Sequence, residues 1–334
     1  MKSITREIES ITSRKLCLCD VGARWGIEKP WKSFRNIIDL ISFEPDKEEY
    51  DLLAKKKESR DIIYPYALSS DQKKASLNLA KNRGNSSLYK PNFNFLKNYP
   101  YSENYKIEET VSVEVTSLDA LQSDKIITNM DFIKIDVQGA ELDILKGGEK
   151  LLNKNILGIE VEVEFHPMYE SVPFFSDIDS FIRNSLGLQI QDIKKAYWKY
   201  SEGINIGATK GQLVFGDALY FRPPQSIVSW CSNFHKDEAS NKLHMACLMG
   251  IAYGYLDYSL CILNQPLIND FIEIDKINRW KSVIHRYGKS LYYKGKGARY
   301  LSDIFNLLSR MFQPIQEGSS GQHLGSRKKF GIFR

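Results

Sequence analysis

Acidic residues at the ends of apolar runs are where this sequence could carry chemistry. Asp136 lies near the end of Asp131–Val137, a run that reads as a strand buried on both faces; Gly139 and a helix from Glu141 follow it. A carboxylate in such a place is costly unless it has a partner or a role. Ligands of open α/β sheets bind at the carboxyl ends of the strands. Asp136 is therefore the first candidate for a functional residue.

Glu44 closes a second apolar run. An acid at the end of a second strand is placed to accept hydrogen bonds from a ribose diol, and it discriminates against ligands that lack the hydroxyls. Pro45 and the end of the third strand, Ala67 and Leu68, would then provide apolar walls for an adenine. The alternative is that Glu44 caps the following helix together with Asp46.

The first strand runs into a glycine-containing turn with Asp20, Gly22, Ala23 and Gly26. Glycines there let the backbone approach a ligand, with free amides pointing into the crevice. The spacing is not that of a dinucleotide fingerprint, because Arg24 stands where a closely packed glycine is expected. Taken alone, this turn is a weak signal.

Strands alternate with helices along the first two thirds of the chain, which predicts right-handed crossovers and a parallel α/β sheet. A hairpin is expected to close this sheet. The expected strands are Leu16–Val21, Ile41–Phe43, Ile62–Leu68, 131–137, Ile156–Phe165 and the hairpin 188–200 and 211–221, and the expected helices are Trp31–Leu40, Lys47–Lys57, 141–148 and Pro173–Leu186.

The chain divides into four predicted parts. Residues 1–14 form an N-terminal helix, and 15–223 form the main domain, in which 69–117 is an insertion. Two alternatives stay open for this insertion: a lid over the carboxyl edge, or a decorated sheet edge. Residues 224–315 are a mainly helical extension, and 316–334 are a disordered basic tail.

Composition is that of a globular protein, with 43% hydrophobic and 26% charged residues. The five cysteines have no zinc spacing and indicate packing in a reducing compartment. The N-terminus has no apolar segment of a secretory signal, so a cytoplasmic location is expected. Residues 224–334 hold fifteen Lys and Arg against eight Asp and Glu. This excess leaves open an acidic partner surface, although a solvated basic face is the simpler explanation.

Several motifs occur in the order seen in the FkbM-type family of S-adenosylmethionine (SAM)-dependent O-methyltransferases, which residues 15–222 resemble. They are Asp20–Gly26, Phe43–Asp46, Ser86–Leu88, Thr116–Asp119, Asp131–Glu141, Leu145–Gly147 and Gly211–Phe221. The resemblance implies a Rossmann-like seven-stranded class I methyltransferase sheet with helices on both faces and an antiparallel last strand.

The same resemblance implies that the cofactor is SAM. Asp20 and Gly22 would meet its methionine part, Glu44 its ribose, and Asp136 would line the site of methyl transfer. Arg24-Trp25 departs from the commonest family pattern, which leaves the contact with the methionine carboxylate open.

Methylation of a hydroxyl needs a general base at the carboxyl edge. The candidates are Asp136, Glu162, Glu164 and His166, the histidine having a structural alternative before Pro167. Glu160 shares a strand face with the two other glutamates and is expected to pair with Lys134. Alternatively, Asp136, Glu162 and Glu164 could hold a magnesium ion that orients two sugar hydroxyls.

The predicted function is methylation of a sugar hydroxyl in a surface polysaccharide or glycolipid precursor, a substrate class that rests on the resemblance. The alternatives are a natural-product hydroxyl or carboxylate as the acceptor, or a non-catalytic SAM-binding scaffold. A nucleic-acid substrate is disfavoured because the main domain is slightly acidic. Homodimerisation, peripheral contact with the inner face of a membrane, and docking of another enzyme stay open for the extension.

Overall fold

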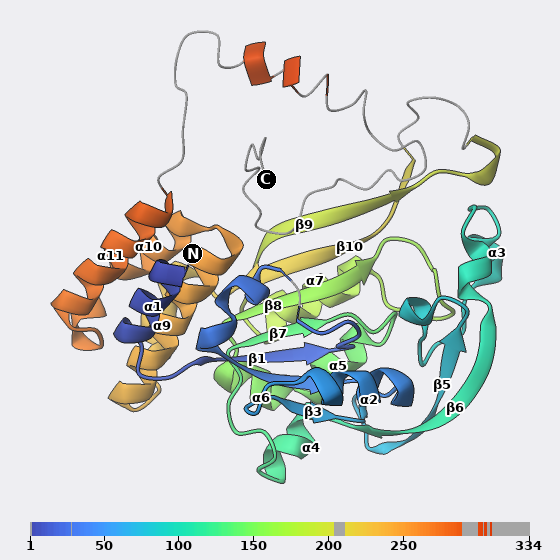
Figure 1. The fold of residues 1–334 in the computed structure, drawn as a ribbon, viewed down its shortest axis with the longest axis horizontal. Helices are drawn as coiled ribbons and strands as arrows, with labels where there is room; N and C mark the ends of the chain where they lie inside the picture. Colours follow the sequence, from blue (N-terminus) through green and yellow to red (C-terminus); the bar gives the residue numbers. More distant parts are fainter. Residues whose placement is uncertain are drawn as a thin grey trace.

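The computed structural model describes residues 2–27, 29–203 and 211–288, with a few residues between 300 and 308. Its centre is a seven-stranded sheet in the order β3-β2-β1-β7-β8-β10-β9 (Figure 1). Strands β1, β2, β3, β7 and β8 run parallel, whereas β10 is antiparallel to both of its neighbours, which confirms the predicted sheet. The strands are β1 (Leu16–Val21), β2 (Ile38–Phe43), β3 (Ile62–Tyr64), β7 (Phe132–Ile135), β8 (Gly158–Glu164), β9 (Gln189–Trp198) and β10 (Gln212–Phe221).

Helices cover both faces of this sheet. One face packs against α4 (Leu118–Ser123), α5 (Glu141–Gly147), α6 (Glu149–Asn155) and α7 (Phe175–Ser185). The other packs against α1 (Lys2–Ile11), the 3₁₀ helix η1 (Trp31–Ile37), α8 (Pro224–Cys231), α9 (Lys236–Tyr253), α10 (Leu256–Leu263) and α11 (Ile274–Gly288). A further helix, α2 (Lys47–Lys56), follows β2.

The C-terminal helices share one hydrophobic core with the sheet. Met249 and Tyr253 of α9 belong to the same buried cluster as Leu18, Phe132 and Leu219 of the strands. The hydroxyl of Tyr253 also donates to a carboxylate oxygen of the β8 residue Glu160. Figure 1 shows α1 beside α11 in this layer. Residues 224–288 therefore complete one face of the sheet.

A buried charge cluster ties this layer to the start of β7. Asp131 is fully buried and accepts hydrogen bonds from Arg14 at 2.5 and 2.9 Å. Lys242 of α9, also fully buried, donates to Asp131 Oδ1 at 2.8 Å and to the carbonyl oxygen of Asn155 at 2.7 Å. Burial alone would raise the pKa of Asp131, but Lys242 and Arg14 outweigh it and lower that pKa to about 2.

The segment between the third strand and α4 builds a second, small sheet. It contains β4 (Ala67–Leu68), β5 (Lys73–Ala80) and β6 (Ile107–Thr116), in the order β4-β6-β5. Short helical turns lie between β5 and β6: η2 (Arg83–Asn85), α3 (Phe93–Leu96) and η3 (Ser102–Tyr105). In Figure 1 this β5–β6 arm lies at the end of the molecule opposite α11. Whether it acts as a lid stays a prediction.

Two expected elements differ from the structure. The helix expected over Trp31–Leu40 is a 3₁₀ helix that ends at Ile37, because Ile38 already pairs with Leu16 of β1. The strand expected over Ile62–Leu68 is split between the two sheets. Pro65 separates β3 from β4, and its missing N–H cannot continue a ladder.

The predicted disordered tail, residues 316–334, lies outside the described residues. None of the helices in the described ranges has the length and hydrophobicity that crossing a membrane requires.

Candidate active site

A cleft of about 780 Å³, part of it open to solvent, lies at the carboxyl ends of β1, β2 and β7. Its far wall comes from β4, β5 and the turn of η2. Its position is where α/β sheets bind ligands. Six of the predicted site residues line it: Gly22, Glu44, Pro45, Ala67, Leu68 and Asp136.

Gly22 places the turn after β1 directly against the end of β7. Its φ is +79°, and a Cβ built at this position would lie 2.0 Å from the carbonyl oxygen of Asp136. Only glycine fits there without moving the backbone. The amides of Gly22 and Ala23 donate to the carbonyl oxygen of Phe43, at 3.0 and 3.2 Å. The expectation of free amides in the crevice is therefore wrong at these two positions, because β2 uses them.

Asp20, Ala23 and Gly26 were predicted to contact the cofactor, and none of them lines the cleft. Asp20 is buried within β1, in register with Lys134 of β7. Ala23 is buried in the turn. Gly26 has a φ of +75°, and its amide N–H donates to the carbonyl oxygen of Ala23. Ala23 and Gly26 thus help to shape the turn, whereas Asp20 belongs to the strand before it.

Glu44 is buried at the end of β2, and its Oε1 accepts a hydrogen bond of 2.9 Å from the amide of Asp46. Asp46 itself is the N-cap of α2 and accepts from the amide of Glu48. The capping alternative therefore holds for Asp46, whereas Glu44 lies two residues earlier and faces the cleft. Burial raises the pKa of Glu44 to about 7.

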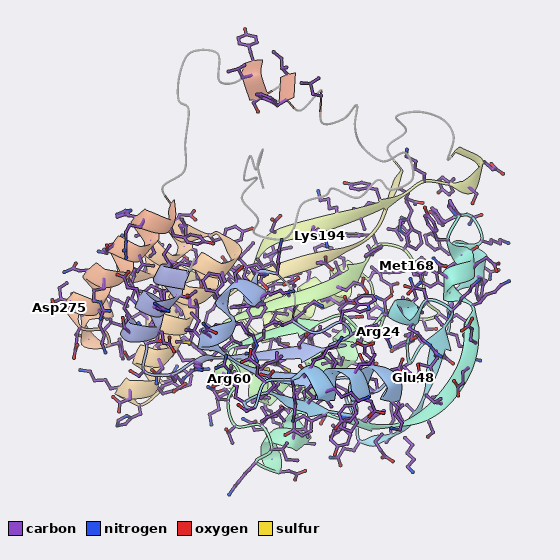
Figure 2. All side chains as sticks on the ribbon, in the orientation of Figure 1. Arg24, Glu48, Arg60, Met168, Lys194 and Asp275 are labelled. Carbon is purple, nitrogen blue, oxygen red and sulfur yellow. The ribbon has the colours of Figure 1, made fainter. Side chains whose placement is uncertain are left out.

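Arg24 joins the turn after β1 to the start of α2. Its guanidinium makes ion pairs with Asp46 at 2.5 Å and with Glu49 at 3.5 Å. Trp25 follows in the left-handed region, with φ +68° and 73% of its surface exposed. In Figure 2, Arg24 lies right of the centre, on the side of the β5–β6 arm, and Asp275 of α11 lies at the far left.

Asp136 follows β7, and one third of its side chain is exposed in the cleft. Its Oδ2 lies 3.7 Å from the ammonium of Lys134, and its Oδ1 accepts from the amide nitrogen of Gln138 at 3.0 Å. The same Gln138 nitrogen donates to Glu162 at 2.6 Å, and the Tyr169 hydroxyl donates to its amide oxygen at 2.9 Å. Gln138 thereby fixes the orientation of Asp136.

The comparison with protein families decides what kind of protein carries this cleft. The model of the methyltransferase FkbM domain matches residues 20–188, which is about half of the chain. This chain belongs to the FkbM family. That family is one of SAM-dependent methyltransferases, so the resemblance read from the motifs is confirmed.

Three solved structures with similar folds are distant in sequence. The FkbM methyltransferase of Methylobacillus flagellatus is 15% identical, with a TM-score of 0.36 over 62% of this chain and only 43% of its own length. Magnesium protoporphyrin IX methyltransferase of Synechocystis, solved with bound SAM, is 8% identical, with a TM-score of 0.33 over 66% of this chain and 76% of that one.

TrmK of M. capricolum, in complex with its natural cofactor product S-adenosylhomocysteine (SAH), is 12% identical, with a TM-score of 0.32 over 85% of this chain and 97% of that one. Among curated proteins, none matches this FkbM-family chain.

Three predicted bases of this FkbM-family chain, Glu162, Glu164 and His166, lie outside the cleft lining. Glu162 is buried and accepts a hydrogen bond from the side-chain nitrogen of Gln138. Glu164 is buried, its Oε2 accepts from the amide of Met168 at 3.2 Å, and burial raises its pKa to about 9. Such a carboxyl group keeps its proton at neutral pH and is then no base. His166 shares a hydrogen bond of 2.7 Å with Gln212 and stacks on Phe95, which agrees with its structural alternative.

The carboxylates proposed as a magnesium site do not assemble into one. Within the described part of the chain, no group of three or more His, Cys, Asp or Glu is arranged to hold a metal ion. Gln138 lies between Asp136 and Glu162, and Glu164 is engaged with Met168. Lys134 and Glu160 are neighbours in the register of β7 and β8, but the observed ion pair of Lys134 is with Asp136, and Glu160 accepts a hydrogen bond from Tyr253.

The lining residues that sequence reasoning missed include Trp25, Arg83 and Gln138. Gln138 occurs within the most specific motif, directly before Gly139, and a polar residue at that turn is the signal that could have drawn attention to it. Arg83 precedes a loop glycine, and nothing in its local sequence indicates that the loop enters the cleft.

Proposed function

We propose that this chain is a SAM-dependent O-methyltransferase that acts on a hydroxyl group of a sugar, in a precursor of a surface polysaccharide or glycolipid. One observation carries the proposal: the carboxylates of Glu44 and Asp136 reach a single cleft from the ends of β2 and β7. The sugar class comes from the family resemblance.

The lining of the cleft fits the chemistry of SAM. Glu44 offers a carboxylate to the two ribose hydroxyls, and such a pairing rejects ligands that lack them. Pro45, Ala67 and Leu68 offer apolar contacts for a purine. A sulfonium cation is also favoured near carboxylates, here Glu44 and Asp136.

Bound SAM supplies a methyl group that is already activated, so the protein mainly has to hold the acceptor in line. Such orientation is worth about 7–11 kcal/mol. Asp136 is the exposed carboxylate at the edge of β7, and we assign to it the removal of the acceptor's hydroxyl proton, worth about 10²–10⁴-fold in rate. Trp25 offers a flat apolar surface at the mouth for the apolar face of a sugar ring.

The test is methyl transfer from isotopically labelled SAM to a panel of nucleotide sugars and oligosaccharides. Asp136→Asn is expected to lower turnover by about 10²-fold or more while still binding SAH. Asp124→Asn, at an exposed position outside the cleft, is the matched control and should keep full activity.

Transfer to phenols or carboxylates, with none to sugars, would overturn the sugar class and favour the natural-product alternative. SAH binding without transfer to any acceptor would favour the scaffold alternative.

A further inference from the structure

Arg83 is a cleft residue whose charge is not matched by the protein. It lines the cleft from the turn of η2, and its Nη1 atom is buried without a hydrogen-bond partner in the part of the chain that the structure describes. No ion pair involves it among those residues either. A buried guanidinium nitrogen in this state is costly unless a ligand completes its hydrogen bonds.

The other two cations of the cleft are paired. Arg24 contacts Asp46 and Glu49, and Lys134 contacts Asp136.

The remaining acid, Glu44, also has a partner, because its Oε1 accepts from the amide of Asp46. The protein thus leaves Arg83 as the cleft cation that is available to an anion brought by a ligand.

The turn that presents Arg83 is held in place by its own hydrogen bonds. Asn82 accepts from the amide of Gly84 at 3.2 Å, and the amide of Ser86 donates to the carbonyl oxygen of Arg83 at 3.2 Å. The Ser86 hydroxyl accepts from the amide of Ala80 at 3.1 Å.

The opposite wall of the cleft also contacts this turn. A Cβ at Gly84 would meet Cη2 of Trp25 at 3.0 Å, so the indole packs against the turn. The turn that carries Arg83 is therefore a well-packed wall of the cleft.

We infer that Arg83 binds an oxyanion, a carboxylate or phosphate, of a molecule held in the cleft. The planar guanidinium matches these groups with two parallel hydrogen bonds. The inference rests on the proposed function and deepens it. Two molecules of that reaction would bring such an oxyanion: SAM, through the carboxylate of its amino-acid part, or the sugar acceptor, through an acidic group.

The test is calorimetric titration of wild type, Arg83→Gln and Arg83→Lys, with Lys81→Gln as an exposed control from the same turn. The cofactor probes are SAH and 5′-methylthioadenosine, which keeps the nucleoside thioether but lacks the carboxylate. The acceptor probes are glucuronate, glucose 1-phosphate and neutral glucose, each titrated into free and SAH-loaded protein. A thermal unfolding midpoint of Arg83→Gln equal to that of wild type shows that the variant folds.

A cofactor source predicts that Arg83→Gln weakens SAH binding at least tenfold, about 1.4 kcal/mol, and changes methylthioadenosine binding less than twofold. An acceptor source predicts unchanged SAH binding and a tenfold loss for glucuronate or glucose 1-phosphate. Arg83→Lys should restore part of either loss.

Equal binding of SAH and of every anionic probe by wild type and Arg83→Gln would overturn the inference, as would wild type binding no anionic probe at all. If wild type binds neither SAH nor methylthioadenosine, the proposed function fails by itself, and the anionic probes on free protein still decide about Arg83.

Discussion

At the scale of single residues, the cleft is shaped by positions where a side chain is absent or a charge is suppressed. Gly22 lets the turn after β1 touch the backbone of Asp136, and burial raises the pKa of Glu44 to about 7. Asp136, with one third of its side chain exposed, is therefore the more accessible of these two carboxylates.

Replacing Gly22 with alanine is expected to destabilise the protein and abolish SAH binding. The positive φ alone costs about 1–3 kcal/mol for a residue with a Cβ, and the contact of 2.0 Å with Asp136 requires the backbone to move as well. Urea unfolding and SAH titration measure both effects. Gly203→Ala, where a Cβ meets nothing within 4 Å, is the control, and equal behaviour of the two variants would contradict this account of the turn.

Glu164 gives the protein a pH-dependent stability. Because its folded pKa of about 9 lies above that of an unfolded glutamate, its contribution is complete below about pH 4.5 and is lost as the pH rises toward 9. Glu164→Gln should therefore gain stability relative to wild type between pH 5.5 and 8.5, by up to about 1.4 kcal/mol per pH unit.

Urea unfolding at pH 5.5 and at pH 8.5 measures this gain, with Glu170→Gln, at an exposed position, as the control. A difference between Glu164→Gln and wild type that does not change with pH would show that Glu164 titrates normally.

At the scale of elements, the charge cluster around Asp131 connects the segment after α1, the start of β7, and α9. Asp131→Asn is expected to lower the free energy of unfolding at pH 7 by about 3–5 kcal/mol, because Lys242 and Arg14 then lose their anion. Wild type should lose this advantage as the pH falls below 3.8 toward 2, since the folded pKa is the lower one.

Chemical denaturation at pH 7 and pH 3 measures the loss. Asp237→Asn is the control, because that side chain is 92% exposed and should change stability by less than about 0.5 kcal/mol. A similarly small effect of Asp131→Asn would mean that the cluster is not a stabilising link.

Strands were predicted well where apolar runs are bounded by polar turns, and β1 has the expected limits. Errors arose where tertiary pairing overrides local pattern. Ile38 would fit a helix locally, but pairing with β1 draws it into a strand. The division of Ile62–Leu68 depends on β6, which pairs with Ala67 and lies nearly fifty residues further along the chain.

At the scale of the whole molecule, the seven-stranded sheet and the C-terminal helices depend on each other. Leu219 and Phe221 of β10 are buried in the cluster that α9 completes. A chain cut after residue 223 would expose these residues, so it should not fold cooperatively. Circular dichroism with thermal unfolding, beside the full chain, measures this; a cooperative transition in the shortened chain would contradict the shared core.

The residues of the cleft could be predicted only in part. Glu44 and Asp136 follow from their places at strand ends, which the local sequence reveals. Gln138 and Arg83 could not be predicted, because tertiary structure decides their contacts. Gln138 donates to Glu162 of β8, and Arg83 reaches the cleft through the β5–β6 arm. The predicted membrane and homodimer contacts of the extension stay predictions.

The most direct test is calorimetric titration of SAM and SAH into wild type and Glu44→Ala, with Glu48→Ala, exposed on α2, as the control. The account predicts about micromolar binding by wild type and by Glu48→Ala, and a loss of at least tenfold, about 1.4 kcal/mol, for Glu44→Ala. Absence of binding to folded wild type, or equal affinity of Glu44→Ala, would contradict the assignment of this cleft to the cofactor.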